Sequence, residues 1–411
     1  MLLTCRSCQQ PLRTLFADLG MAPFSNAFRT AEELSEPELF YPLRAYVCDR
    51  CKLVQLPNVA APESHFNDHY LYLSSFTPSW VEHARRYVDM AERRFGLDAR
   101  SFVVEIASND GYLLQFLKAK KIPCLGVDPA ANCAAAAREK FGVDTLVTFF
   151  DPDTAKLLLE KYGPADLVVA NNVLAHVPEL NHFVASVARV LKADGVASFE
   201  FPHLLRLMAE NQFDTIYHEH YSYLSYHAVA PLLSRHGLFA FDAERLSTHG
   251  GSLRLFVGRF GARWPISQVV QALADEERDA GLGCLDVYLS FAKQVAGTKR
   301  KLQSLLNRLK EQGSTIAGYG APAKGNTLLN YCGIRTDIID FTVDRNTFKQ
   351  GRYLPGSLIP ILPVEAIEQR RPDYLLVLPW NLQTEIFEQM GFIKEWGGKF
   401  ILPIPVPEIV S

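Results

Sequence analysis

The chain has 411 residues, 48% of them apolar and 21% charged, which is the composition of an ordinary globular protein. This length predicts two or three domains, because domains of about 100–200 residues are the norm. The net charge of −3 gives no electrostatic reason to expect nucleic acid or an anionic membrane as a partner.

The start of the chain lacks an apolar run long enough for a signal peptide. No uncharged apolar run approaches the roughly 18 residues that a membrane span requires. We therefore expect a cytoplasmic protein that does not contact a membrane. In that reducing compartment, cysteines are expected to be thiols or metal ligands rather than disulfides.

Four of the cysteines form two Cys-x-x-Cys pairs, Cys5/Cys8 and Cys48/Cys51. Two such pairs supply four thiolates for a tetrahedral zinc ion, and a shell closed by four sulfurs leaves no position for a substrate. The alternative is four free thiols at coincidental spacing. Residues 1–66 are rich in proline and turn residues, so we expect a small β-rich domain that is stabilised by structural Zn²⁺.

Residues 67–262 alternate between strand-like and helical patterns. Apolar, strand-like runs lie at residues 101–106, 124–128, 166–170 and 196–201. Helical runs lie at residues 79–95, 112–119, 130–141 and 180–191. Strands that alternate with helices predict an α/β domain with a parallel, doubly wound sheet.

Residues 263–411 are expected to form a third domain that begins with helices. Residues 264–313 have a helical pattern, and the spacing of an amphipathic helix is found at Leu302, Leu305, Leu306 and Leu309. Strand-like runs follow at residues 315–320, 338–344 and 374–379. The sequence therefore predicts a second α/β unit.

A possible nucleotide loop follows the first strand of the central domain. The strand that contains Glu105 runs into Ala107-Ser108-Asn109-Asp110-Gly111 and then into a predicted helix. Such a turn presents backbone N–H groups and a positive helix end to a ligand. Asp128 ends the next strand, where a carboxylate can accept both ribose hydroxyls of an adenosine. The alternative is a strand–helix turn that binds nothing.

This turn resembles motif I of class I methyltransferases, and Asp128 matches the acidic residue of their motif II. Ala107 stands where many of these enzymes have a glycine, so its methyl group is expected near the cofactor. The resemblance implies S-adenosylmethionine as cofactor. The residues that it places against this cofactor are Glu105, Ala107, Ser108, Asn109, Gly111, Asp128, Asn171 and Asn172.

The segment from Tyr217 to Tyr223, Tyr-His-Glu-His-Tyr-Ser-Tyr, is a run of polar and aromatic side chains. Such a density of titratable groups is poor material for a core, and histidine and tyrosine can move protons in a cleft. The spacing does not match the His-Glu-x-x-His helix of zinc proteases. An aromatic-rich loop is the alternative. Upstream, His176 reads either as a helix cap or packed side chain, or as a further polar group of a site.

The cysteine pairs, the turn after Glu105, the segment from Tyr217 to His220 and the run Gly318-Tyr319-Gly320-Ala321-x-x-Lys324-Gly325-Asn326 together resemble the sugar C-methyltransferases of deoxysugar biosynthesis. The motifs occur in the same order over essentially the whole chain. The resemblance implies a zinc-binding domain, a class I methyltransferase domain and a C-terminal Rossmann-like domain. It also implies methylation at C-3 of a 4-keto-6-deoxy sugar linked to thymidine or guanosine diphosphate.

The same resemblance implies residue roles. His220 is the candidate general base, supported by Tyr217, Glu219 and His176, with Tyr72 as the active-site tyrosine, although Tyr70 fits that pattern equally well. Substrate contacts are expected from Tyr70, Gly318, Tyr319, Gly320, Lys324, Asn326, Asp344, Lys349 and Tyr353. A 4-keto group acidifies the C-3 proton, so a base can form an enolate that attacks the sulfonium methyl.

Three other functions remain open at this point. A zinc-ribbon RNA methyltransferase needs a basic face, which the overall charge does not supply. A non-catalytic nucleotide-binding protein would keep the fold without the chemistry. A dehydrogenase would need the full G-x-G-x-x-G fingerprint, which neither glycine-rich turn contains. We expect a monomer or weak dimer with a small-molecule partner.

Overall fold

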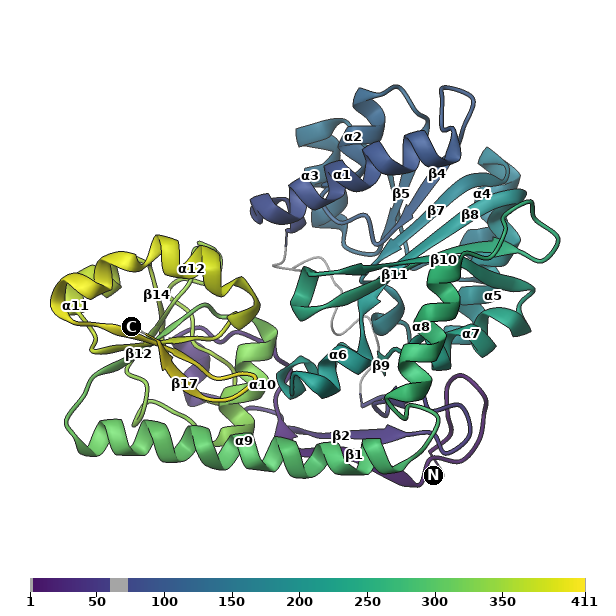
Figure 1. The fold of residues 1–411 in the computed structure, drawn as a ribbon. Helices are drawn as coiled ribbons and strands as arrows, with labels where there is room; N and C mark the ends of the chain where they lie inside the picture. Colours follow the sequence, from purple (N-terminus) through teal and green to yellow (C-terminus); the bar gives the residue numbers. More distant parts are fainter. Residues whose placement is uncertain (1–2, 60–72, 411) are drawn as a thin grey trace.

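The computed structural model describes residues 3–59 and 73–410 of the protein, and Figure 1 shows its three sheets with their helices. Tyr70 and Tyr72 lie outside the described residues. No helix in the described part of the chain is both long and apolar enough to cross a bilayer.

The N-terminal sheet is antiparallel and has the order β1-β2-β3-β9. Its strands are β1 (Thr14–Ala22), β2 (Tyr41–Val47), β3 (Val54–Gln55) and β9 (Ser222–Tyr223). The first three confirm the expected β-rich start of the chain. The fourth strand, β9, comes from a distant part of the sequence and forms the end of the Tyr217–Tyr223 segment that contains His220. The N-terminal sheet is therefore completed by the stretch of chain that carries the candidate base.

The central sheet has the order β10-β11-β8-β7-β4-β5-β6. Its strands are β4 (Val103–Ile106), β5 (Cys124–Asp128), β6 (Thr145–Val147), β7 (Ala165–Asn171), β8 (Leu191–Pro202), β10 (Leu238–Leu246) and β11 (Ser252–Arg259). The five strands from β8 to β6 are parallel, whereas β11 and β10 form an antiparallel hairpin at the edge. The predicted parallel sheet is confirmed, and the hairpin is an addition to it.

Helices and short 3-10 turns cover the central sheet, except that α6 and η5 pack into the core shared with the first and third sheets. The helices are α1 (Pro78–Phe95), α2 (Leu114–Ala119), α3 (Ala131–Phe141), α4 (Pro152–Tyr162), α5 (Leu180–Val190), α6 (Leu204–Ala209), α7 (Tyr226–Arg235) and α8 (Gln268–Asp279). The 3-10 turns of this part are η3 (Ser74–Phe76), η4 (Leu174–His176), η5 (Phe213–Thr215) and η6 (Thr248–Gly250). Helix α8 packs on β10 and α7, so the first of the predicted leading helices lies against the central sheet.

The third sheet has the order β14-β13-β12-β15-β16-β17, with only β17 antiparallel to its neighbour. Its strands are β12 (Ile316–Tyr319), β13 (Thr342–Val343), β14 (Ile361–Leu362), β15 (Tyr374–Val377), β16 (Lys399–Leu402) and β17 (Glu408–Val410). The helical elements around it are α9 (Asp286–Glu311), α10 (Ala323–Cys332), α11 (Ala366–Arg370), η7 (Trp380–Leu382), α12 (Gln383–Gln389) and η8 (Gly391–Trp396). The predicted second α/β unit is present.

Helix α9 joins the first and third sheets, and Figure 1 shows it running along both. The four leucines with amphipathic spacing are buried, as that spacing predicts. Nearer the start of the helix, Phe291 stacks on Phe16 of β1 with 4.7 Å between ring centroids. One continuous apolar core therefore extends from the N-terminal sheet through α9 into the third sheet. A second core contains the cysteine pairs and one face of the central sheet.

Candidate functional site

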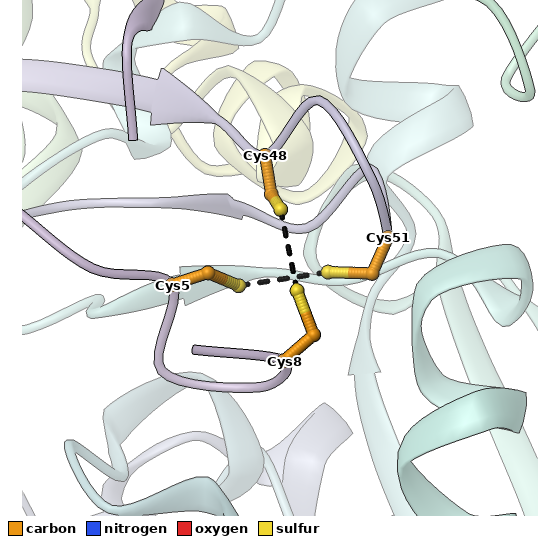
Figure 2. A group of neighbouring side chains, drawn as sticks. All are labelled: Cys5, Cys8, Cys48 and Cys51. Carbon is orange, nitrogen blue, oxygen red and sulfur yellow. Dashed lines mark hydrogen bonds between the residues drawn. The ribbon is translucent and has the colours of Figure 1, made fainter. Parts of the chain in front are cut away.

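The four paired cysteines gather into one cluster, and Figure 2 shows their sulfur atoms pointing toward a common centre. The Sγ atoms of Cys5 and Cys51 are 3.5 Å apart, as are those of Cys8 and Cys48. All four sulfurs lie within 4.8 Å of one another. A tetrahedral zinc ion with Zn–S bonds of about 2.3 Å requires sulfurs roughly 3.8 Å apart. The four side chains therefore fit one zinc ion without rearrangement of the backbone.

The first cysteine pair is also fixed to the central domain. Between the two cysteines, Arg6 donates from Nη1 to the carbonyl oxygen of Pro178 at 2.8 Å, and its guanidinium lies over the ring of Tyr221. Asn181 donates to the carbonyl oxygens of Arg6 and Ser7 at 2.9 Å. These bonds attach the metal loop to the chain that carries His176 and to the segment that carries His220.

The turn after β4 has the strained backbone of a ligand-binding loop. Ala107, Asn109 and Gly111 all have positive φ, at 54°, 48° and 79°. Left-handed backbone is uncommon for residues with a side chain. Ala107 therefore occupies a position whose backbone conformation favours glycine. The backbone N–H of Asn109 donates to Oδ2 of Asp128 at 2.9 Å. This bond closes the turn against the carboxyl end of β5.

The residues predicted around this turn separate into two groups. Glu105 and Ser108 are buried inside the sheet, and burial raises the pKa of Glu105 well above its usual range. These two side chains support the turn from behind. Asp128 and Asn171 end the two parallel strands on either side of β4, at the same edge of the sheet. Among the described residues, Asn171 has no hydrogen-bond partner for either side-chain amide atom.

Asn172 follows Asn171 in the chain and has a φ of 56°. Its backbone N–H donates to the carbonyl oxygen of Glu200 at 2.7 Å. The carboxyl edge of the central sheet thus presents the turn, Asp128 and the two asparagines together. In an open α/β sheet this edge is where ligands bind.

The candidate base lies in a hydrogen-bonded group. His220 has its Nδ1 atom 2.9 Å from the carbonyl oxygen of Thr215, and its Nε2 atom 2.7 Å from the hydroxyl of Tyr217. A carbonyl oxygen only accepts hydrogen bonds, so Nδ1 carries the proton and Nε2 holds a free electron pair that accepts from Tyr217. This is the tautomer that a general base requires.

Two further predicted residues surround this histidine. The ring of His176 lies edge-on to that of His220 with 4.6 Å between centroids, and its Nδ1 atom lies 2.8 Å from the carbonyl oxygen of Glu219. The carboxylate of Glu219 accepts from the amide of Asn26 at 2.7 Å. Burial raises the pKa of Glu219 to about 7. The predicted catalytic set is therefore one cluster within the described residues.

This cluster is more buried than the sequence suggests. His218, Glu219 and Tyr221 are each less than a tenth exposed. The expectation that so many titratable groups make poor core material is therefore wrong for these three side chains. Their burial is explained by local partners, such as the rings of Phe24 and Tyr41 around His218. Tyr217, His220 and His176 keep part of their surface accessible.

The residues predicted in the third domain lie at the carboxyl edge of its sheet. Gly318 and Tyr319 belong to β12, and Gly320 follows with a φ of 89°. The carboxylate of Asp344 accepts from the N–H of Ala321 at 2.7 Å. The ammonium of Lys349 donates to the carbonyl oxygen of Ala321 at 2.9 Å. The two predicted loops of this domain therefore meet.

Three other predicted residues of this domain make different contacts. Asn326 donates to the carbonyl oxygen of Ser25 at 2.6 Å, and the backbone of Tyr353 pairs with that of Arg29. These two residues connect the third domain to the N-terminal one. Lys324 instead donates to the side chain of Asn381 at 2.8 Å.

A buried charged group at the end of β8 has no counterpart among the sequence predictions. Glu200 accepts from Arg254 at 2.5 Å and lies 2.9 Å from Nε2 of His83. It also accepts from the hydroxyl of Thr248 at 3.0 Å. A carboxylate inside an otherwise apolar strand was the signal in the sequence, because Glu is rarely buried without a partner.

His249 is a second residue that the sequence analysis does not assign. It lies at the tip of the β10–β11 hairpin with a φ of 56°, edge-on to Trp80 at 5.1 Å. Burial, together with the charge of Lys324, lowers the pKa of His249 to about 4. The sequence signal was a histidine before two glycines, Gly250 and Gly251, which permit a sharp turn.

Comparisons with known families cover nearly the whole chain. Residues 5–66 match the family model described as "Putative zinc binding domain", and residues 80–239 match "Methyltransferase domain". Residues 247–405 match "C-methyltransferase C-terminal domain". The C-methyltransferase NovU of Streptomyces niveus is 35% identical over 407 residues, which cover 99% of this chain and 96% of NovU.

Two solved methyltransferase structures resemble part of the chain. An S-adenosylmethionine-dependent methyltransferase from Clostridium acetobutylicum is 13% identical with a TM-score of 0.35, covering 44% of this chain and 92% of that one. Magnesium protoporphyrin IX methyltransferase from Synechocystis, with bound SAH, is 15% identical with a TM-score of 0.35, covering 44% and 83%.

Proposed function

Because the chain belongs to the family of S-adenosylmethionine-dependent C-methyltransferases, we propose that it methylates C-3 of a nucleotide-linked 4-keto-6-deoxy sugar. The match to NovU and the three family models confirm the resemblance, the α/β fold and the use of S-adenosylmethionine and zinc. The position of methylation and the sugar are the proposal. The main support is the tautomer of His220. Its Nδ1–H donates to the carbonyl oxygen of Thr215, so Nε2 keeps an electron pair, which accepts from the hydroxyl of Tyr217.

A carbon atom becomes a nucleophile only when a neighbouring carbonyl acidifies its proton. His220 would take the C-3 proton on Nε2, in the place where the Tyr217 hydroxyl now donates. The electron pair of the broken C–H bond then moves onto the C-4 oxygen as an enolate. Bound S-adenosylmethionine supplies an electrophilic methyl group, to which C-3 bonds as the carbon–sulfur bond breaks. Proton transfer of this kind contributes about 10²–10⁴-fold.

The remaining predicted residues fit supporting roles. Asp128, Asn171 and the turn after β4 would hold the cofactor at the edge of the central sheet. The four cysteines would hold zinc in a closed shell, which makes the metal structural. The loops that meet at Ala321 would bind the nucleotide part of the substrate.

The direct test is a methylation assay with S-adenosylmethionine and a panel of 4-keto-6-deoxy sugars linked to thymidine or guanosine diphosphate. We expect one panel member to gain the mass of one methylene, and NMR to place the new methyl group on C-3. A methyl group on oxygen or nitrogen would contradict the proposal. So would methylation of RNA with no sugar product.

Asp128→Asn should weaken the binding of S-adenosylmethionine by about 10–100-fold, because hydrogen bonds to a charged group contribute roughly 1.5–3 kcal/mol. Isothermal titration calorimetry measures this directly. The matched control is Asp144→Asn, because Asp144 is an exposed partner of Arg138. Equal affinity in both variants would remove Asp128 from the cofactor site.

The pH dependence of C-3 proton exchange should show an acidic limb below pH 6.5. Burial lowers the pKa of His220 well below its usual 6.5, and His176 lowers it further. A base must be unprotonated, so activity is lost only when the pH falls through this lowered pKa. Because Glu219 has a pKa of about 7, the measurement is repeated in Glu219→Gln. Half-loss at pH 6.5 or above in that variant would contradict the assignment.

A further inference from the structure

Lys324 lies on a helix that packs against the turn before the candidate base. It is in the first turn of α10, and its ammonium donates to Oδ1 of Asn381 at 2.8 Å. The same ammonium lies 4.7 Å from the centre of the Trp380 ring. Within the described residues it has no carboxylate inside ion-pair distance. Lys324 is thus held by a neutral amide and an aromatic face, which leave its other N–H bonds for a ligand.

The surroundings of Lys324 connect it to the His220 segment. Helix α10 packs on η5, and Thr327 donates to the carbonyl oxygen of Ile216 at 3.1 Å. Thr215, the last residue of η5, is the residue whose carbonyl oxygen fixes His220. The N-terminal half of α10 therefore lies against the turn that positions the base.

Trp380 provides a second connection. Its indole N–H donates to the buried carboxylate of Asp214 at 2.7 Å, and Asp214 belongs to η5. Gly250 is also close to this ring, because a Cβ atom added at Gly250 would lie 2.7 Å from the indole carbon Cη2. The hairpin tip that carries His249 thus touches the same ring that lies beneath Lys324.

Electrostatics agree with this placement. Burial and His176 lower the pKa of His220, and the charge of Lys324 contributes to the same shift. Burial raises the pKa of Asp214 to about 6, and the charge of Lys324 opposes that rise. Burial also lowers the pKa of Lys324 itself. One ammonium is therefore within electrostatic range of the base and of the carboxylate in η5.

An enolate needs such a group. Removal of the C-3 proton places negative charge on the C-4 oxygen, which is attached to the adjacent carbon. The cation that stabilises this oxygen must therefore lie near the base, and donors aimed at a developing oxyanion contribute about 10²–10³-fold. The hydroxyl of Tyr217 already bonds to His220, and Nδ1 of His176 already lies 2.8 Å from the carbonyl oxygen of Glu219. Lys349 differs, because its ammonium donates to the carbonyl oxygen of Ala321 and interacts electrostatically with the carboxyl groups of Asp344 and Glu219.

We propose that the Lys324 ammonium, positioned by Asn381 and Trp380, binds the C-4 oxygen of the substrate and stabilises the enolate, whereas Lys349 serves the nucleotide. This inference rests on the proposed function, because it names the atom of the 4-keto sugar that Lys324 contacts. It also separates two lysines that the sequence places in one phosphate-binding group.

The experiment compares Lys324→Met with Lys349→Met in the full-length protein. Three quantities are measured: C-3 deuterium exchange at saturating sugar, kcat for methylation, and the Kd of the nucleoside diphosphate, thymidine or guanosine, that the wild type binds. For Lys324→Met we expect exchange and kcat to fall about 10²–10³-fold with the Kd within about threefold of wild type. Lys324→Arg keeps the charge and should recover much of the exchange.

For Lys349→Met the expected pattern is the reverse, with weaker nucleotide binding and a smaller loss of exchange. A Lys324→Met enzyme that exchanges at the wild-type rate but binds the nucleotide poorly overturns the inference alone. A wild-type enzyme that never exchanges the C-3 proton of any panel sugar overturns the proposed function and the inference together. A wild-type circular dichroism spectrum and thermal midpoint of unfolding show that each variant is folded.

Discussion

His220→Asn should lower C-3 deuterium exchange and methylation together, by about 10²–10⁴-fold, the usual contribution of a positioned base. Asparagine can still form a hydrogen bond to the Thr215 carbonyl oxygen, so the turn is expected to remain. It has no group that accepts a proton at neutral pH. Exchange is followed by NMR in D₂O without S-adenosylmethionine, which isolates the deprotonation step from methyl transfer.

The matched control is His182→Asn, because His182 is an exposed histidine of α5 on the surface of the central domain. It should exchange at the wild-type rate. If His220→Asn exchanges as fast as the wild type but no longer methylates, His220 acts after deprotonation and another group is the base. His176, whose ring touches that of His220, would then be the next residue to test.

Loss of the zinc site should abolish folding of the N-terminal sheet and, with it, activity. Cys48→Ser removes one of four sulfurs from a shell that has no spare ligand. Metal binding contributes an apparent 10–16 kcal/mol in zinc-finger peptides, which exceeds the stability of most domains. We expect the zinc content, measured by atomic emission, to fall from about one ion per chain to near zero. The thermal midpoint of unfolding should fall as well.

The cysteine that serves as control is Cys284, which is exposed and outside the cluster. Cys284→Ser should keep its zinc, its thermal midpoint and its activity. A Cys48→Ser protein that retains the wild-type midpoint would show that the metal does not stabilise the fold. Full activity after removal of zinc by a chelator would show the same.

The sequence predicted most accurately the elements whose pattern is local. The strand at residues 124–128 was placed at its true bounds, and the amphipathic leucines of α9 identified its buried face. The helical pattern over residues 264–313 did not reveal a break after Asp279, because Gly281 and Gly283 are compatible with either reading. Local periodicity indicates which residues are apolar on one side, and it does not indicate where one helix ends.

Pairings between distant segments could not be predicted. Strand β9 is two residues long and pairs with β3 of another domain, so no periodicity marks it. Glu200 stood out only as a carboxylate in an apolar strand, because its partners His83 and Arg254 lie far away in the sequence. His249 lies against Trp80 only because the hairpin brings the two rings together. Each depends on tertiary contacts that a single sequence does not encode locally.

The shared strand β9 has a consequence for building chimeras of related enzymes. A crossover point near residue 66, which the sequence suggests as a domain boundary, would join a foreign β3 edge to Ser222 and Tyr223 of the recipient. The mismatch would fall two residues from the base. An active chimera should therefore take the N-terminal segment and the Tyr217–Tyr223 stretch from the same parent enzyme.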